Sequence, residues 1–343
     1  MKPKNLSSPK PHASSGTTGL LRTTCVMRLL LLVLLMLPAV VQAQFDYTTQ
    51  NGTITITGYT GPGGAVAIPA TINGLPVTSI GGYAFRNRTS LTSITVPSSI
   101  TNIGSWAFEG CTGLVTMTIG SGVTSMGDIV CSRCTSLTAI TVDADNSIYG
   151  SVDGVLVNKS QTTLIRFPQG KTGNYTIPSS VTSIGSWAFQ YCTGLTGVTI
   201  PSNVTSIREN AFSDFISLKG VYFLGRAPRF GSGILGGDST ATVYYLPGTA
   251  GWGPTFGGRP TAPWLLPNPL ILNNGSRFGV RTNQFGFVIS WATNASVVVE
   301  ASADLAQPIW TPVGTNTLTD GSSYFSDPQW MNYPARFYRL RSP

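Results

Sequence analysis

The sequence predicts a β-dominated repeat solenoid with a 23-residue unit, followed by a small all-β, sandwich-like module. The first observation is repetition: close copies of one segment begin at residues 77, 100 and 123, and again at 181 and 204. A fixed period of this size is typical of a solenoid, whose units bury their apolar faces against their neighbours. The second observation is that the repeats stop after Pro267, where short strand-like runs separated by turn residues begin.

Each repeat contains a short strand with alternating apolar residues. A Leu is followed three and five residues later by Ile, Val or Met, as in Leu91, Ile94 and Val96. The last two share one face of a strand, so the residues between them face the other way. Stacked strands therefore present an outward row rich in threonine, which we expect to be the binding face. Its candidate binding residues are Thr95, Thr118, Thr141, Arg166, Thr176, Thr199 and Tyr222.

A second short apolar segment and a compact Ala-Phe element complete the unit. The apolar segments include residues 100–103 and 181–184, and the elements after them include Ala107-Phe108 and Ala188-Phe189. We expect the Ala-Phe element to form a helical turn whose Phe fills the core. The residue three positions after this Phe is often Cys.

The consensus VTSIGxxAFxxCtxLtxvtIPssV resembles the BspA-type leucine-rich repeat over about residues 52 to 250. The resemblance implies a leucine-rich-repeat solenoid of short strands and short helical turns. It also implies a bacterial surface or secreted protein used for adhesion and protein recognition. It implies no reaction and no fixed set of ligand-contacting residues.

The N-terminal residues 1–43 have the organisation of a signal peptide. Residues 29–37 contain only Leu, Val and Met, a run too short to span a bilayer, and Val41-Gln42-Ala43 is a small-residue cleavage site. Met27, directly before Arg28, looks like a more natural start of translation than Met1. We expect cleavage near Ala43 and secretion or display at a bacterial cell surface, with no transmembrane segment in the mature chain. An uncleaved signal anchor is the alternative.

The rest of the chain divides into two predicted domains. Residues 44–264 are expected to form the solenoid with a cap at each end, and residues 265–343 the C-terminal β module. Between the repeats that begin at 123 and 181, residues 165–168 and 175–178 each repeat a strand-plus-proline signature. We therefore expect two abbreviated units in this stretch.

Charge and histidine content exclude several function classes. The chain has 21 Lys and Arg against 13 Asp and Glu, but five of the basic residues and no acidic residue lie in residues 1–43. The mature chain therefore has a net charge of only +3, which gives no reason to expect nucleic acid as a partner. The single histidine, His12, also lies in the leader. Without it the mature chain cannot form a Ser-His-Asp site or a His-ligated zinc site. Paired carboxylates for glycoside hydrolysis are the remaining enzymatic alternative, but Glu109, Asp128, Glu209 and Asp214 occupy unrelated positions in separate units. We therefore predict no enzyme activity, no cofactor and no metal.

Cysteines and acidic turn residues leave alternatives open. Cys111, Cys134 and Cys192 each lie eleven residues after the start of a unit, and Cys131 takes the Phe position of its unit. Repeat register therefore favours buried structural thiols, although a Cys111–Cys134 disulfide, or redox or metal chemistry, is possible by spacing. Residues 143–146, Asp-Ala-Asp-Asn, are interpreted as a turn, with calcium binding as the alternative. Residues 231–236 match GxGxxG but lack a βαβ context, so we expect a loop.

The C-terminal module is rich in aromatic residues and ends in FYRLR, a sequence similar to the ends of other secreted bacterial β-proteins. Buried rings would fill the core of a small sandwich, and this interpretation is favoured; exposed rings would bind carbohydrate. A third role is retention at the cell surface or export. The aromatic residues are Trp291, Trp310, Tyr324, Trp330, Tyr333, Phe337 and Tyr338.

Two functions follow as hypotheses. The first is a secreted or surface-displayed, non-catalytic adhesion protein that recognises an extracellular protein or polysaccharide through the exposed sheet. The alternative is a structural spacer or surface-layer element, in which the C-terminal module binds carbohydrate or retains the protein at the surface.

Overall fold

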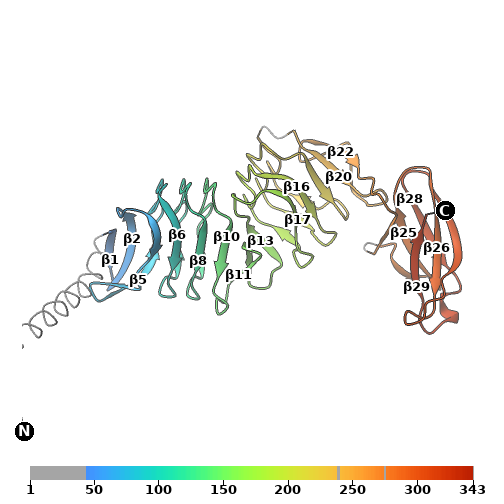
Figure 1. Cartoon of the computed structure of the whole chain (residues 1–343), viewed down its shortest axis with the longest axis horizontal. Coiled ribbons are helices and arrows are strands. Elements are labelled where there is room, and N and C mark those ends of the chain that lie inside the picture. Colours follow the sequence, from blue (N-terminus) through green and yellow to red (C-terminus); the bar gives the residue numbers. More distant parts are fainter. Residues whose placement is uncertain (1–43, 238–239, 274–275, 343) are drawn as a thin grey trace, which may run out of the picture.

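The computed structural model describes residues 44–237, 240–273 and 276–342. The predicted signal peptide, its cleavage site and His12 lie outside these residues. Figure 1 shows an elongated stack of strands from β1 to β22, followed by a separate group of strands at the C-terminus. Within the described ranges the only helix is the 3₁₀ turn η1 (Trp330–Asn332), and no helix is long and apolar enough to cross a membrane. The prediction of a β-dominated solenoid is therefore confirmed.

The long strands of the repeats stack in parallel, and each apolar face points into the solenoid. They form two sheets, with the orders β10-β8-β6-β3 and β14-β16-β18-β20-β22-β21, and the terminal strand β21 of the second sheet pairs antiparallel with β22. The first contains β3 (Gly64–Ala67), β6 (Leu91–Val96), β8 (Thr116–Ile119) and β10 (Ala139–Val142). The second contains β14 (Gly173–Thr176), β16 (Leu195–Ile200), β18 (Gly220–Phe223), β20 (Thr242–Tyr245), β21 (Thr255–Phe256) and β22 (Arg259–Pro263).

The short apolar segments predicted in each unit form a second pair of sheets. The N-terminal one contains β1 (Phe45–Gln50), β2 (Thr53–Tyr59), β4 (Thr71–Ile72), β5 (Leu75–Ile80), β7 (Asn102–Ile103) and β9 (Ser125–Met126). The other contains β11 (Tyr149–Val152), β12 (Val155–Asn158), β13 (Thr163–Arg166), β15 (Ser183–Ile184), β17 (Ser206–Ile207) and β19 (Arg229–Phe230). The antiparallel hairpin β1–β2 pairs with β5 and covers the first unit, as expected for a cap.

The Ala-Phe element is a series of turns, so the expectation of a helical turn is wrong. Two residues that flank Ala107-Phe108 have left-handed backbones. They are Trp106, with φ of 56°, and Gly110, with φ of 70°. Two left-handed residues four positions apart prevent a right-handed helical turn between them. The other units repeat this pair of left-handed positions, for example at Trp187 and Tyr191.

The Phe of each element lies in the core, as predicted. Phe85, Phe108, Phe189 and Phe212 are all at most 1% exposed. Neighbouring rings stack with centroids 4.9 Å apart for Phe85 and Phe108 and 4.8 Å apart for Phe189 and Phe212. This distance equals the strand spacing of about 4.8 Å, so the rings form ladders along the solenoid axis.

The stretch between the third repeat and the repeat at 181 contains one abbreviated unit, not two. It begins with the antiparallel hairpin β11–β12, which pairs with β13. Strand β13 then pairs in parallel with β15, and β14 with β16, so these two strands belong to a single unit. The strand-plus-proline signature at 165–168 misled the prediction because it follows a strand of the short-strand sheet. The buried core divides at this point into two clusters.

The four cysteines that the structure describes are free and buried, as repeat register predicts, and the Cys111–Cys134 disulfide is not formed. The Cys111 thiol donates to the carbonyl of Phe85 at 3.0 Å, and the Cys134 thiol to the carbonyl of Phe108 at 3.1 Å. Each thiol thus links its repeat to the preceding one. Burial raises the pKa of the Cys111 thiol to about 12.

The acidic segment 143–146 is a turn, and Asn146 explains its composition. The Asn146 side chain is fully buried, and its Nδ2 donates to the carbonyls of Gly120 and Val123. Its Oδ1 accepts from the amides of Ile148 and Tyr149 at 3.0 and 2.8 Å. All four hydrogen bonds fix the exit from the third repeat, which favours the turn interpretation over a cation site.

The C-terminal strands form two facing sheets. One contains β23 (Leu270–Leu272), β24 (Gly279–Arg281), β25 (Gln284–Ser290) and β28 (Ser322–Asp327), and the other β26 (Ala295–Ser302), β27 (Thr311–Leu318) and β29 (Phe337–Arg341). Phe287 and Ile289 of β25 pack with Val297 and Val299 of β26 in one core. A smaller cluster that includes Leu246 and Leu272 joins this module to the end of the solenoid. Short strands separated by turns are therefore present in this part of the chain, as predicted.

Candidate binding surface

The predicted threonine row exists over the first three long repeat strands. Thr95 pairs in register with Thr118, and Thr118 with Thr141, while Ala67 stands beside Thr95. The three threonine side chains are exposed. Parallel strands with identical phase place equivalent side chains directly beside one another, so the hydroxyl groups repeat at the strand spacing of about 4.8 Å.

The row continues on the second long-strand sheet and changes character there. Thr176 pairs with Thr199, Thr199 with Tyr222, and Tyr222 with Tyr244. Thr176 is exposed, and the other three are half-buried. The structure therefore brings six of the seven predicted residues onto the outward face, in two groups of three. The two groups belong to separate sheets, with the hairpin β11–β12 placed between them in the sequence.

The position predicted for Arg166 is wrong. Arg166 ends β13, which pairs with β12 and β15 in the short-strand sheet, and its side chain is only 6% exposed. The guanidinium Nη1 donates to the carbonyl of Trp187 inside the solenoid. The residue was misplaced because Ile165-Arg166-Phe167-Pro168 has the letters of a long strand but the pairing of a short one.

An aromatic cluster closes the C-terminal end of the row. The rings of Tyr222 and Tyr244 are stacked, with centroids 5.0 Å apart and planes 9° apart. The Trp264 ring lies 4.9 Å from Tyr222. Sequence reasoning selected Tyr222 but missed Tyr244 and Trp264. The signal that could have found Tyr244 is its position 22 residues after Tyr222, close to one repeat period.

Two glycines determine how the Tyr222 ring lies. A Cβ on Gly220 would come within 2.7 Å of Tyr222 Cζ, and one on Gly197 within 3.3 Å of Tyr222 Cε2. Any larger residue at 220 would therefore push the ring away from the sheet. The ring leans over the sheet beside Gly197 and Gly220. The result is a ledge with an aromatic wall next to the threonine hydroxyls; we call Tyr222, Tyr244 and Trp264 the aromatic ledge.

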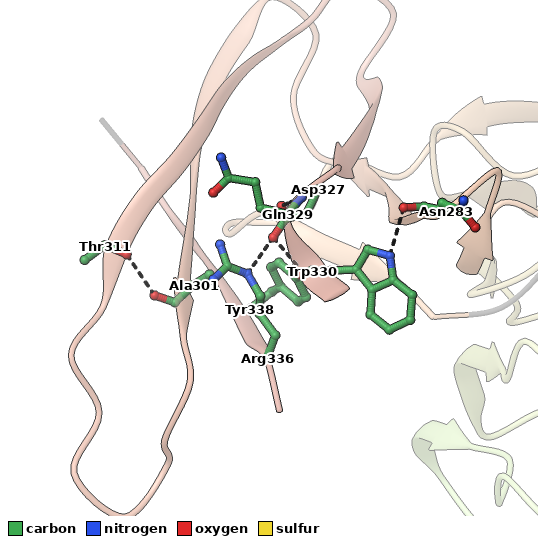
Figure 2. A network of polar contacts seen from close by, with 8 residues as sticks. All are labelled: Asn283, Ala301, Thr311, Asp327, Gln329, Trp330, Arg336 and Tyr338. Carbon is green, nitrogen blue, oxygen red and sulfur yellow. Dashed lines mark hydrogen bonds and ion pairs between the residues drawn. The ribbon is translucent and has the colours of Figure 1, made fainter. Parts of the chain in front are cut away.

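The C-terminal module contains a second aromatic site, shown in Figure 2. The buried Asp327 carboxylate accepts from Arg336 Nε at 2.6 Å, from the Tyr338 hydroxyl at 3.0 Å and from the Gln329 amide at 2.8 Å. Burial, followed by the hydrogen bond and charge of Asp327, raises the pKa of Tyr338. The Trp330 indole donates to the carbonyl of Asn283 at 3.1 Å, and Thr311 donates to Ala301 elsewhere in the module.

This network supports a small pocket of about 210 Å³. Trp330, Tyr333 and Arg336 contribute to its wall, and the Arg336 guanidinium lies 3.9 Å from the centroid of the Tyr333 ring. Of the predicted aromatic residues, Trp291 and Tyr338 pack against the core, and Trp330 and Tyr333 line the pocket, which Tyr338 also borders. Some of these rings therefore fill the core of the module, and others line a pocket at its surface.

No cluster of potential metal ligands accompanies either site. In residues 44–237, 240–273 and 276–342, no group of three or more His, Cys, Asp or Glu side chains could hold a metal ion.

The repeats match a known family of leucine-rich repeats. A profile of the BspA type leucine-rich repeat region matches residues 71–172 and 166–240, with six copies. The repeat region belongs to the BspA-type leucine-rich repeat family. Solenoids of BspA-type repeats are typical of bacterial surface proteins and of binding proteins, and the family description names a repeat and no reaction. No curated protein matches the chain.

Similar solved structures are bacterial leucine-rich repeat proteins. The T. pallidum leucine-rich repeat protein is 28% identical over 56% of this chain and 85% of its own, with a TM-score of 0.39. A leucine-rich repeat protein from Eubacterium ventriosum is 23% identical over 59% of this chain and 69% of its own, with a TM-score of 0.38. The pneumococcal vaccine antigen PcpA is 17% identical over 59% of this chain and 80% of its own, with a TM-score of 0.38.

Proposed function

We propose that this protein is a secreted or cell-surface, non-catalytic binding protein. It recognises an extracellular protein or polysaccharide through the outward face of its long BspA-type strands. The signal peptide directs export and is cleaved near Ala43, and residues 44–264 and 265–343 act as the two domains of the mature protein. The family supports the class of function, because BspA-type solenoids are typical of surface and binding proteins.

The aromatic ledge is the observation that carries the proposal. Aromatic rings with polar tips supply much contact area at little entropic cost, and they dominate many recognition surfaces. Here two tyrosines and a tryptophan stand together at one end of a row whose other members are threonines. A face used only as a spacer would not require the glycines at 197 and 220 that let the Tyr222 ring lie over the sheet.

The chemistry of the row indicates a neutral ligand. Thr95, Thr118, Thr141, Thr176 and Thr199 each offer a hydroxyl that donates and accepts hydrogen bonds. None of them carries charge, so a highly charged ligand would find no ionic partner in the row. Hydroxyl groups beside aromatic faces suit a sugar chain or an uncharged segment of protein.

The test is a binding screen of the mature chain against polysaccharides, extracellular matrix proteins and cell envelopes. Two variants change the ledge: Tyr222→Ala with Tyr244→Ala removes the rings, and Gly220→Ala displaces the Tyr222 ring and leaves its chemistry intact. We expect both to weaken binding by at least tenfold with similar melting temperatures. Trp330→Ala, in the pocket of the C-terminal module, is the matched control and should bind like the wild type.

The opposite result favours a second function. If Trp330→Ala loses binding and the ledge variants keep it, the module is the binding domain and the solenoid is a structural spacer or surface-layer element. The pocket of Trp330, Tyr333 and Arg336 is the observation that supports this alternative, with carbohydrate binding or surface retention as the role of the module. If no variant alters binding, the proposal for the sheet face is wrong.

A further inference from the structure

The junction between the two solenoid cores contains a cavity of about 120 Å³. Met117 of the second repeat and Ile140 of the third border it, together with Tyr149 and Leu156 of the hairpin β11–β12. Ile129 and Trp187, which hold the first left-handed position of their units, lie on either side of it. The cavity is therefore placed where the regular stacking of repeats is interrupted.

Two features of the sequence create this cavity. Cys131 stands at the position occupied by Phe85 and Phe108 in the preceding units, so the ladder of stacked rings stops after Phe108. The next unit is also shortened. Leu164 and Ile184 are equivalent positions, because they pair in the short-strand sheet. Phe167 comes only three residues after Leu164, whereas Phe189 comes five residues after Ile184. A smaller side chain and a shorter turn thus occur at the same place.

Arg166 contributes an unusual charge to this apolar cavity. Its side chain is 6% exposed and lines the cavity. The guanidinium Nη1 donates a hydrogen bond to the carbonyl of Trp187. Within the part of the chain that the structure describes, Arg166 takes part in no ion pair. A guanidinium has five N–H donors, and burying a cation without an anion is strongly unfavourable. The site therefore favours a ligand that brings a negative charge.

Size and surroundings narrow the ligand. An engineered apolar cavity of about 150 Å³ holds benzene, so a cavity of about 120 Å³ suits a ligand of about five or six non-hydrogen atoms. The lining by Met117, Met126 and Ile140 favours an apolar body. The exposed Asp128 at the rim disfavours a second negative charge. A planar guanidinium matches the two oxygens of a carboxylate better than it matches a spherical ion.

We propose that this cavity binds a small monocarboxylate with a short apolar chain, whose carboxylate is held by the guanidinium of Arg166. The apolar chain lies against Met117 and Ile140. This site is separate from the aromatic ledge and does not depend on the function proposed for it.

Calorimetric titration of the mature chain, Gln44 to Pro343, with sodium butyrate tests the proposal. Butyramide, which has the same shape without the charge, and sodium chloride are titrated in parallel. We expect butyrate to bind at least tenfold more tightly than butyramide, and chloride to produce no competition at equal concentration. Arg166→Met should reduce the affinity for butyrate by at least tenfold and change that for butyramide by less than twofold. Cys131→Phe, which places a ring at the cavity wall, should abolish binding of both.

Several outcomes would overturn the proposal: no butyrate binding to the wild type, equal binding by Arg166→Met, or full binding by Cys131→Phe. A chain-length series on the wild type gives an answer even if a variant does not fold. Affinity should be greatest for butyrate among acetate, butyrate and decanoate, because acetate leaves much of the roughly 120 Å³ empty and decanoate is larger than this volume. An affinity that increases continuously to decanoate would mean adsorption to an apolar surface and would also refute the site.

Discussion

Replacing Cys131 with Phe should stabilise the protein. The substitution restores the residue found at this position in the neighbouring units and adds a ring at the wall of the cavity beside Arg166. Cavities destabilise by about 24 cal/mol per Å³, so filling all of the roughly 120 Å³ would contribute about 3 kcal/mol. Fitting a rigid ring costs about 1–3 kcal/mol, so we expect a net gain of about 1 kcal/mol.

Thermal and urea unfolding, followed by circular dichroism, measure this change. For a chain of this size a gain of about 1 kcal/mol raises the melting temperature by about 2–4 °C. Cys192→Phe is the matched control, because Cys192 is fully buried but does not line the cavity. It should destabilise the protein through overpacking. If the two variants destabilise equally, the space beside Cys131 cannot accept a ring and the reasoning is wrong.

Three further predictions concern the turns and the thiols. Gly110→Ala should reduce the free energy of unfolding by about 2 kcal/mol, because φ is 70° and the new Cβ would lie 2.2 Å from Asn87 Oδ1. Its control is Gly64→Ala, which has a similar φ of 74° but open space around the new Cβ and should cost less in the same unfolding assay. Asn146→Ala should cost about 3 kcal/mol through loss of its buried hydrogen bonds, whereas the exposed Asp143→Ala should cost under about 1 kcal/mol. Burial raises the pKa of all four thiols, so a thiol reagent at pH 8 should label none of them before unfolding. Because the unfolded thiols ionise and the buried ones do not, stability should fall as pH rises through 9.0, and a stability that increases there would contradict this assignment.

Local periodicity was enough to predict most of the solenoid. The spacing of Leu91, Ile94 and Val96 determines which strand face is buried, and this spacing is a property of neighbouring residues in one segment. Register followed from the same pattern: identical units in parallel place Thr95 beside Thr118 and Thr141. The buried Phe residues and the buried cysteines were predicted for the same reason.

Only the tertiary structure showed where the repetition fails. Arg166 lies in a segment whose letters fit either kind of strand, and pairing with β12 and β15 placed it inside the solenoid. The aromatic ledge required Tyr222, Tyr244 and Trp264 to come together from segments with different local patterns. The cavity depends on Cys131 and on the shortened turn before Phe167, which meet only in the stack. The sequence by itself thus determined the repeat, the buried and exposed faces and the class of protein, because these depend on short-range spacing. The position of Arg166, the ledge and the cavity were decided by the fold, because they depend on contacts between units that are not identical.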